Sequence, residues 1–114
     1  MDDRAYQQLA DAALARIEKA FLDVDPDDVD CERSGDVVTL VLKGGRKCVV
    51  NTQRPTRQIW LAANARAWHF AWDDGAKSWV DDKGQLNGDG SRVELFGALR
   101  RIVRESSGLE VDLA

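Results

Sequence analysis

A strand–turn–strand pattern at Asn51–Ala62 constrains the fold of this chain more than any other feature of the sequence. Pro55 lacks a backbone donor and disfavours helix at the residue before it, so it marks a turn between two extended segments. In the second segment Ile59 and Leu61 point to one side and Trp60 to the other, because side chains alternate along a strand. Burying each aliphatic side chain gives about 1.5–3 kcal/mol, so we expect the Ile59 and Leu61 side to be covered.

The position of Trp60 then has two interpretations. If one face of the sheet is uncovered, Trp60 lies there among the amides of Asn51, Gln53 and Gln58, a composition typical of an interface hot spot. Alternatively, Trp60 belongs to the core and its amide neighbours are half-exposed. The alternation favours the first interpretation.

Helical spacing of apolar residues predicts one helix near each end of the chain. Asp2 or Asp3 can cap the first helix, which should end between Leu22 and Asp25, ahead of Pro26. Its apolar positions are Tyr6, Leu9, Ala13, Ile17 and Phe21. The second helix is predicted to begin at a capping box formed by Ser91 and Glu94, and its apolar stripe comprises Leu95, Leu99, Ile102 and Val103. Gly108 is a plausible C-cap, and the tail 109–113 could either pack against the helices or fray.

Between these helices the pattern is one of strands and turns. Extended segments are expected at 29–32, 37–42, 47–53, 58–62, 68–72 and 78–80, followed by a polar, glycine-rich loop at 81–90. With no helix between strands, the sheet should be a meander with both helices on one face. The sequence therefore predicts an α+β fold: a two-layer sandwich with a five- to six-stranded antiparallel sheet, as a single domain over residues 1–114.

Composition excludes several classes of protein. The chain has 114 residues, 32% charged residues and a net charge of −4, which is ordinary for a soluble protein and unfavourable for nucleic-acid binding. Six bases and no acid lie between Lys43 and Arg66, but no nucleic-acid motif accompanies them. With no apolar run of about 20 residues and no signal-like N-terminus, we expect a cytoplasmic location and no membrane partner. Cys31 and Cys48 should be reduced core residues.

An acidic run is the first feature that could carry chemistry. Six carboxylates fall within ten residues with no base among them: Asp23, Asp25, Asp27, Asp28, Asp30 and Glu32. Carboxylate oxygens suit Ca²⁺, Mg²⁺, Mn²⁺ and iron, whereas zinc is a poor fit without Cys or His. An EF-hand is excluded because Asp28 stands where glycine is needed. The run can equally be a solvated acidic face or a docking strip for a basic protein patch.

Catalytic motifs are missing from the sequence. The single histidine, His69, alternates with Trp68 and Phe70 and should point to the uncovered face, where it is either a plain surface histidine or a partner contact. It has no evident nucleophile and acid partners, and no phosphate-binding glycine loop follows a strand. We therefore expect a protein that is not an enzyme.

The pattern N-x-Q-x-P-x-x-Q-I-W-L at residues 51–61, with acids crowded upstream, resembles the frataxin family and its bacterial members in particular. The similarity runs from Leu9 to about Val103. The resemblance implies weak binding of ferrous and ferric iron, and of other divalent cations, along an acidic ridge. Carried over to this chain, the ridge comprises Asp11, Glu18, Asp23, Asp25, Asp27, Asp28, Asp30 and Glu32. Lys19 and Leu22 depart from the family pattern, because bacterial relatives commonly have acids there.

The resemblance also implies partners. These are the cysteine desulfurase and the scaffold protein of iron–sulfur cluster assembly. The resemblance implies that the acidic ridge contacts the desulfurase, and that the face with Asn51, Gln53, Gln58, Trp60 and His69 contacts the scaffold and the desulfurase assembly. It implies a monomer that iron can assemble into oligomers, acting as an iron donor or as a modulator of the desulfurase–scaffold complex. One alternative is an interaction module of the same machinery without physiological metal binding. Another is a ferrous-oxidising enzyme, although the sequence lacks the Glu and Glu-x-x-His set of di-iron bundles.

Overall fold

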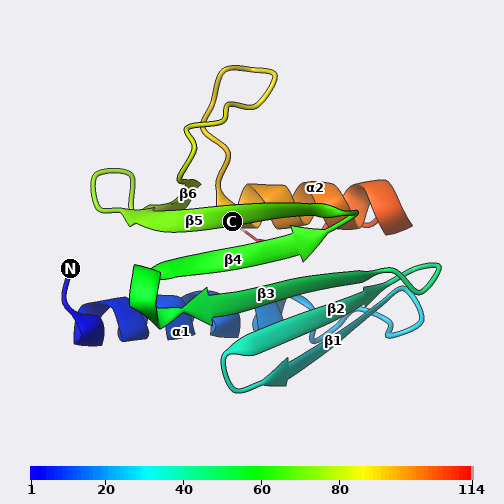
Figure 1. Ribbon diagram of the computed structural model, residues 1–114. Coiled ribbons are helices and arrows are strands. Elements are labelled where there is room, and N and C mark those ends of the chain that lie inside the picture. Colours follow the sequence, from blue (N-terminus) through cyan, green and yellow to red (C-terminus); the bar gives the residue numbers. More distant parts are fainter. Residues whose placement is uncertain (114) are drawn as a thin grey trace.

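The computed structural model describes residues 1–113, which form a two-layer sandwich of one antiparallel sheet and two helices (Figure 1). The sheet has the order β1-β2-β3-β4-β5-β6, so every strand pairs with its neighbour in sequence. Helix α1 (Asp3–Ala20) contacts β1 and β2, and helix α2 (Leu95–Ser107) contacts β2 and β6. The strands are β1 (Val29–Ser34), β2 (Val37–Leu42), β3 (Lys47–Gln53), β4 (Gln58–Ala63), β5 (Arg66–Asp73) and β6 (Ser78–Asp81). The predicted α+β meander is confirmed.

The core lies between the sheet and the helices. Ile59 pairs with Phe70 and Leu61 pairs with Trp68 across β4 and β5, and the two aliphatic side chains are fully buried, as their alternation predicts. Tyr6 of α1 is also fully buried. Its hydroxyl donates to the Gln58 carbonyl at 2.7 Å and accepts from the Gln53 N–H at 3.1 Å. These bonds fix α1 to both ends of the β3–β4 connection, which contains the short 3-10 helix η1 (Arg54–Thr56).

Both predicted helices form, with shifted ends. Asp2 caps α1 by accepting from the Ala5 N–H at 2.8 Å, but the helix ends at Ala20, before the predicted range, because the chain turns at the buried Phe21. The predicted capping box at Ser91 is wrong. Glu94 is itself the N-cap of α2 and accepts from the Phe96 and Gly97 N–H groups.

The backbone before α2 explains why the capping box does not form. The Val93 carbonyl accepts from the Asp81 N–H at 2.9 Å, and Glu94 bridges to Val80, so this segment extends the sheet at β6. A Cβ at Gly97 would lie 2.7 Å from the Glu94 carboxylate, so any larger residue there would force the capping side chain to shift. Gly108, at φ 72°, ends α2 as predicted.

The C-terminal tail packs against the helices. Val111 and Leu113 are buried, and Arg100 of α2 donates to the Leu113 carbonyl. Of the two outcomes left open by the sequence, packing is the one observed. None of the helices in residues 1–113 has the length and apolar character needed to cross a membrane.

The two cysteines should react slowly with alkylating agents. Burial, with a smaller contribution from Glu18 and Asp30, raises the pKa of Cys31 to about 11, and burial raises that of Cys48 to about 12. At pH 8 a thiol of pKa about 11 is roughly one part in a thousand thiolate, against about a quarter for an ordinary thiol. We expect iodoacetamide labelling of the folded protein at pH 8 to be about a hundredfold slower than in urea, and to rise tenfold per pH unit. Rapid labelling of the folded protein would contradict this.

Replacing Ala65 by glycine should stabilise the protein. Asn64 and Ala65 form the two-residue turn between β4 and β5, with φ of 54° and 61°. Such turns favour Asn-Gly, because a left-handed backbone costs a residue with a Cβ about 1–2 kcal/mol. We expect Ala65→Gly to raise the free energy of unfolding by ~0.5–1 kcal/mol in urea titrations, after the entropy cost of glycine. Ala67→Gly, at an exposed strand position nearby, is the control and should lower the free energy of unfolding. If both variants lower it equally, the left-handed backbone at Ala65 is not strained.

Candidate functional site

The sheet face away from the helices carries the predicted partner-contact residues. Trp60 lies opposite Asn51 of β3 and opposite His69 of β5, so these three side chains share that face. The Trp60 and His69 rings stack with centroids 4.2 Å apart and an interplanar angle of 14°. Trp60 is half-buried and absent from the core between sheet and helices in residues 1–113. The interpretation of Trp60 as a surface residue is therefore the correct one.

A chain of polar contacts fixes the Trp60 indole. Its Nε1–H donates to Oε1 of Gln58 at 2.9 Å, and Nε2 of Gln58 donates to Oδ2 of Asp82 at 2.9 Å. The same Asp82 oxygen lies 3.9 Å from Nδ1 of His69. Gln58, Trp60, His69 and Asp82, called the indole platform below, thus form a closed set in which each side chain contacts another. With its N–H satisfied within the chain, the indole offers mainly its ring at the surface.

Asp82 is the member of the platform that sequence reasoning missed. It lies just beyond β6, and its backbone N–H donates to the His69 carbonyl at 2.9 Å, which brings its carboxylate to the platform. The sequence signal was weak, because Asp82 falls in a polar, glycine-rich stretch that reads as an ordinary loop. Asn51 flanks the platform on β3, and Gln53 lies opposite Gln58 at the end of that strand.

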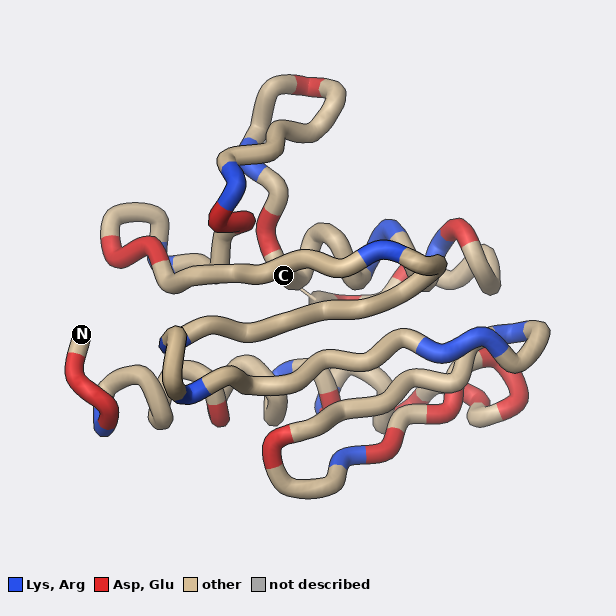
Figure 2. The backbone as a smooth tube through the Cα atoms, viewed as in Figure 1, with Lys and Arg blue, Asp and Glu red and all other residues tan. Residues whose placement is uncertain are grey.

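The acidic run lies on the connection between α1 and β1 and on β1 itself (Figure 2). Asp30 and Glu32 share the uncovered sheet face, because they pair with Val41 and Thr39 of β2, while Val29 is buried on the other side. Asp25 accepts from the Asp27 N–H at 2.9 Å. Within residues 1–113, none of these six carboxylates forms an ion pair. The acidic strip denotes Asp23, Asp25, Asp27, Asp28, Asp30 and Glu32 from here on.

The two helical residues of the predicted ridge, Asp11 and Glu18, have a different environment. Arg33 of β1 points toward α1, donates to Glu18 at 3.0 Å and pairs with Asp11. The two carboxylates raise the pKa of the guanidinium, which stays charged. Sequence reasoning missed these two contacts, although period-two spacing puts Arg33 on the same, helix-facing side of β1 as Val29 and Cys31. The eight predicted metal residues therefore divide into six unpaired carboxylates and two that are paired with a cation.

The carboxylates do not converge on a single point. In the part of the chain that the structure describes, no group of three or more His, Cys, Asp or Glu side chains is placed to hold one metal ion. A cation at the acidic strip would contact one or two carboxylates and keep most of its water. The donor atoms fit iron chemically, and the geometry fits weak, open binding rather than a cage.

Comparison with known proteins supports the family resemblance seen in the sequence. A family model described as a frataxin-like domain matches residues 1–108. The "iron-sulfur cluster assembly protein CyaY" of Paraburkholderia phymatum is 38% identical over 114 residues, covering 100% of this chain and 99% of the relative. The structure of frataxin from Psychromonas ingrahamii aligns with a TM-score of 0.80 and 28% identity, covering 100% of this chain and 99% of that one.

A more distant structure shares the fold. Trimeric frataxin from the yeast Saccharomyces cerevisiae, complexed with ferrous iron, aligns with a TM-score of 0.66 over 96% of this chain and 88% of the yeast chain. At 24% identity this likeness shows the fold alone. The family model and the bacterial relatives, which span nearly the whole chain, show that this chain belongs to the frataxin family.

Proposed function

We propose that this chain is a non-enzymatic protein of iron–sulfur cluster assembly, which donates iron to the cysteine desulfurase–scaffold complex or modulates that complex. Membership of the frataxin family and bacterial relatives named as iron–sulfur cluster assembly proteins support the process. The observation that carries the proposal is the indole platform, a fixed and half-exposed Trp60 on a sheet face that neither helix covers.

The platform is suited to docking because its geometry is set before a partner arrives. Ordering a mobile side chain on binding costs about 0.5–1.5 kcal/mol, and the bond to Gln58 and the stack on His69 reduce that cost for Trp60. Tryptophan is also among the residues that carry most binding energy at interfaces. Asn51 and Gln53, beside the platform on β3, supply amides that hydrogen-bond to a partner. We assign the desulfurase and the scaffold as the proteins that this face contacts.

The acidic strip has two roles in this proposal. Its unpaired carboxylates hold ferrous or ferric iron weakly, and other divalent cations as well, because carboxylate oxygens discriminate little among hard ions. The strip also attracts a basic patch on a protein partner, with a strength that falls as salt rises. A cation held by one or two carboxylates keeps free coordination positions. Those positions allow a second chain to bind the same ion, which gives the monomer a route to iron-dependent oligomers in the cytoplasm.

The second candidate function is an interaction module of the same machinery that binds no metal physiologically. It is favoured by the lack of a converged ligand set in residues 1–113 and by the pairing of Asp11 and Glu18 with Arg33. In that case the strip serves only as a docking surface. The two candidates share the indole platform and differ in the response to iron.

Trp60→Ala should weaken partner binding and leave the fold intact. Trp60 lies outside the core, so its removal should shift the melting temperature by only a few degrees, while loss of a hot spot costs about 2 kcal/mol or more of binding, roughly thirtyfold in Kd. Calorimetric titration against the purified desulfurase and scaffold measures the effect. Asp82→Asn, which weakens the hold on Gln58 and keeps the indole, should have a smaller effect in the same direction.

Arg104→Ala is the matched control, because Arg104 is an exposed side chain on α2, in the layer opposite the platform. Its affinity for both partners should equal that of the parent chain. Unfolding of Trp60→Ala, or equal binding by both variants, would refute the platform as the docking site.

Iron titration should separate the strip from the helical carboxylates. In anaerobic NMR titrations with Fe²⁺ at low salt, amide signals of residues 23–32 should broaden first, because Asp11 and Glu18 are paired with Arg33. Arg33→Gln removes a positive charge and frees both carboxylates. It should extend the broadening to Asp11 and Glu18 and tighten Fe²⁺ binding by roughly threefold or more.

Arg57→Gln is the control for that experiment, since Arg57 pairs with Asp3 at the start of α1 and its loss changes the net charge equally. It should leave the Fe²⁺ affinity of the strip nearly unchanged. Broadening confined to residues outside 23–32 in the parent chain would contradict the iron assignment and favour the metal-free module.

A further inference from the structure

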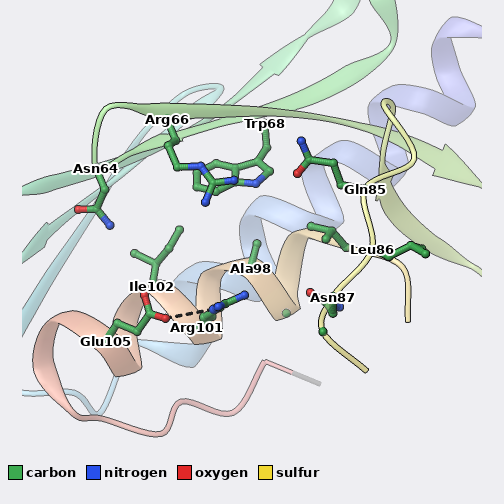
Figure 3. Close-up of a pocket in the computed structure, with 13 residues that line it drawn as sticks. Asn64, Arg66, Trp68, Gln85, Leu86, Asn87, Ala98, Arg101, Ile102 and Glu105 are labelled. Carbon is green, nitrogen blue, oxygen red and sulfur yellow. Dashed lines mark hydrogen bonds and ion pairs between the residues drawn. The ribbon is translucent and has the colours of Figure 1, made fainter. Parts of the chain in front are cut away.

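A cavity of about 220 Å³ lies between the β4–β5 turn, residues 85–88 and α2 (Figure 3). It is built from elements that contribute nothing to the acidic strip. Trp68 lines one wall, and Ala98 and Ile102 of α2 line the other, which gives the cavity an apolar strip. Much of the remaining lining is polar, and it includes an ion pair between Arg101 and Glu105 of α2. The volume is below the ~300–1,000 Å³ of sites for drug-sized ligands and fits a single side chain better than a cofactor.

The mouth of the cavity is positively charged. The Arg66 guanidinium lies 4.7 Å above the Trp68 ring, and it forms no ion pair in residues 1–113. Arg46 of the β2–β3 turn is 3.5 Å from Oδ1 of Asn64, beside the same opening. Lys43 and Lys47 flank that turn, and Figure 2 shows these basic positions together at one end of the sheet. The acidic strip lies at the same end of the sheet, on β1 and its connection to α1. The positive charge is therefore local to the side that holds the cavity, and it is this side that attracts anions.

The strand above the cavity has an open edge. β6 pairs with β5 only from Phe70 to Asp73, and the Asp82 N–H bonds to the His69 carbonyl. Arg66–Trp68 therefore has no strand partner on its outer side within the described chain. An open edge beside a pocket is the arrangement by which proteins bind extended peptides, with backbone pairing at the edge and one side chain in the pocket. Leu86, 62% exposed, lies at the mouth of the same cavity.

We propose that the cavity and the β5 edge bind a short acidic segment of a partner protein in extended conformation. The segment pairs with Arg66–Trp68 and places one aliphatic side chain between Trp68 and Ile102, where Leu86 covers it. Its flanking carboxylates lie against Arg66 and Arg46. This site is separate from the indole platform, so it does not depend on the function proposed above.

The chain offers a precedent for this recognition. Its own tail alternates acidic and aliphatic residues: Val111 and Leu113 are buried, and Arg104 of α2 lies 3.9 Å from the Glu110 carboxylate. An acidic, aliphatic segment is thus already bound against α2. The cavity, which is also lined by α2, offers a second such segment an apolar strip beside Arg66, while its other arginine, Arg101, is already paired with Glu105.

The peptide acetyl-Glu-Asp-Leu-Asp-Glu-amide tests the proposal directly. NMR titration of the full chain should shift the Trp68 indole N–H and the amides of Arg66–Trp68 and Leu86, with a Kd below about 1 mM. Arg66→Glu should weaken binding at least tenfold. Arg4→Glu, an exposed position in the first turn of α1, makes the same change in charge and should leave the Kd unchanged. Ala98→Phe, which fills the cavity, should abolish the shifts while the melting curve stays close to that of the parent.

Several results would overturn the proposal. If the peptide with serine in place of leucine binds equally well, the cavity does not hold the aliphatic side chain. If acetyl-Lys-Lys-Leu-Lys-Lys-amide binds equally well, the arginines do not select acidic flanks. Shifts confined to the platform or the strip, or equal weakening by Arg66→Glu and Arg4→Glu, would also overturn the proposal. If Ala98→Phe fails to fold, the comparison of Arg66→Glu with Arg4→Glu decides alone.

Discussion

The buried hydroxyl of Tyr6 connects the two layers at the point on which the candidate docking surface depends. A hydroxyl removed from water without partners costs about 1–3 kcal/mol, but this one donates to the Gln58 carbonyl and accepts from the Gln53 N–H. Burial raises the pKa of the phenol, which keeps its proton available for donation. Both bonds go to the connection between β3 and β4. They hold Gln58, the first residue of β4, against α1, and the Gln58 side chain accepts the hydrogen bond that fixes Trp60.

One-sided coverage of the sheet makes this arrangement useful. Because both helices lie on one face, period-two alternation places Ile59 and Leu61 in the core and leaves Trp60 on the other side with His69. Trp60 stays half-exposed there, and the bond to Gln58 and the stack on His69 hold it in one orientation. Asp82, just after β6, binds the His69 carbonyl of β5 through its backbone N–H and the Gln58 side chain of β4 through its carboxylate. The platform is therefore held by three neighbouring strands rather than by one loop.

Local periodicity explains what the sequence could predict and what it could not. The faces of Trp60 and His69 followed from alternation, and the meander followed from the lack of helical spacing between the two ends. The capping box at Ser91 failed because the bridge between Glu94 and Val80 holds the segment extended, a contact between elements that spacing does not encode. Arg33 shows the same limit. Its side of β1 could be inferred, but its reach to Asp11 and Glu18 depends on how α1 crosses the sheet.

The contacts of Arg33 also determine how charge is divided on the surface. By pairing with both helical carboxylates, Arg33 offsets part of their charge, and the unpaired negative charge lies on the strip of the α1–β1 connection and β1. The basic positions of the β2–β3 turn lie at the same end of the sheet (Figure 2). On the uncovered face, Asp30 pairs with Val41 and Val41 pairs with Lys47, so the opposite charges are two strand spacings, about 10 Å, apart. That separation is about one Debye length at physiological salt, so each charged region acts on a partner largely on its own. A net charge of −4 therefore describes neither region, and a partner can be oriented by both at once.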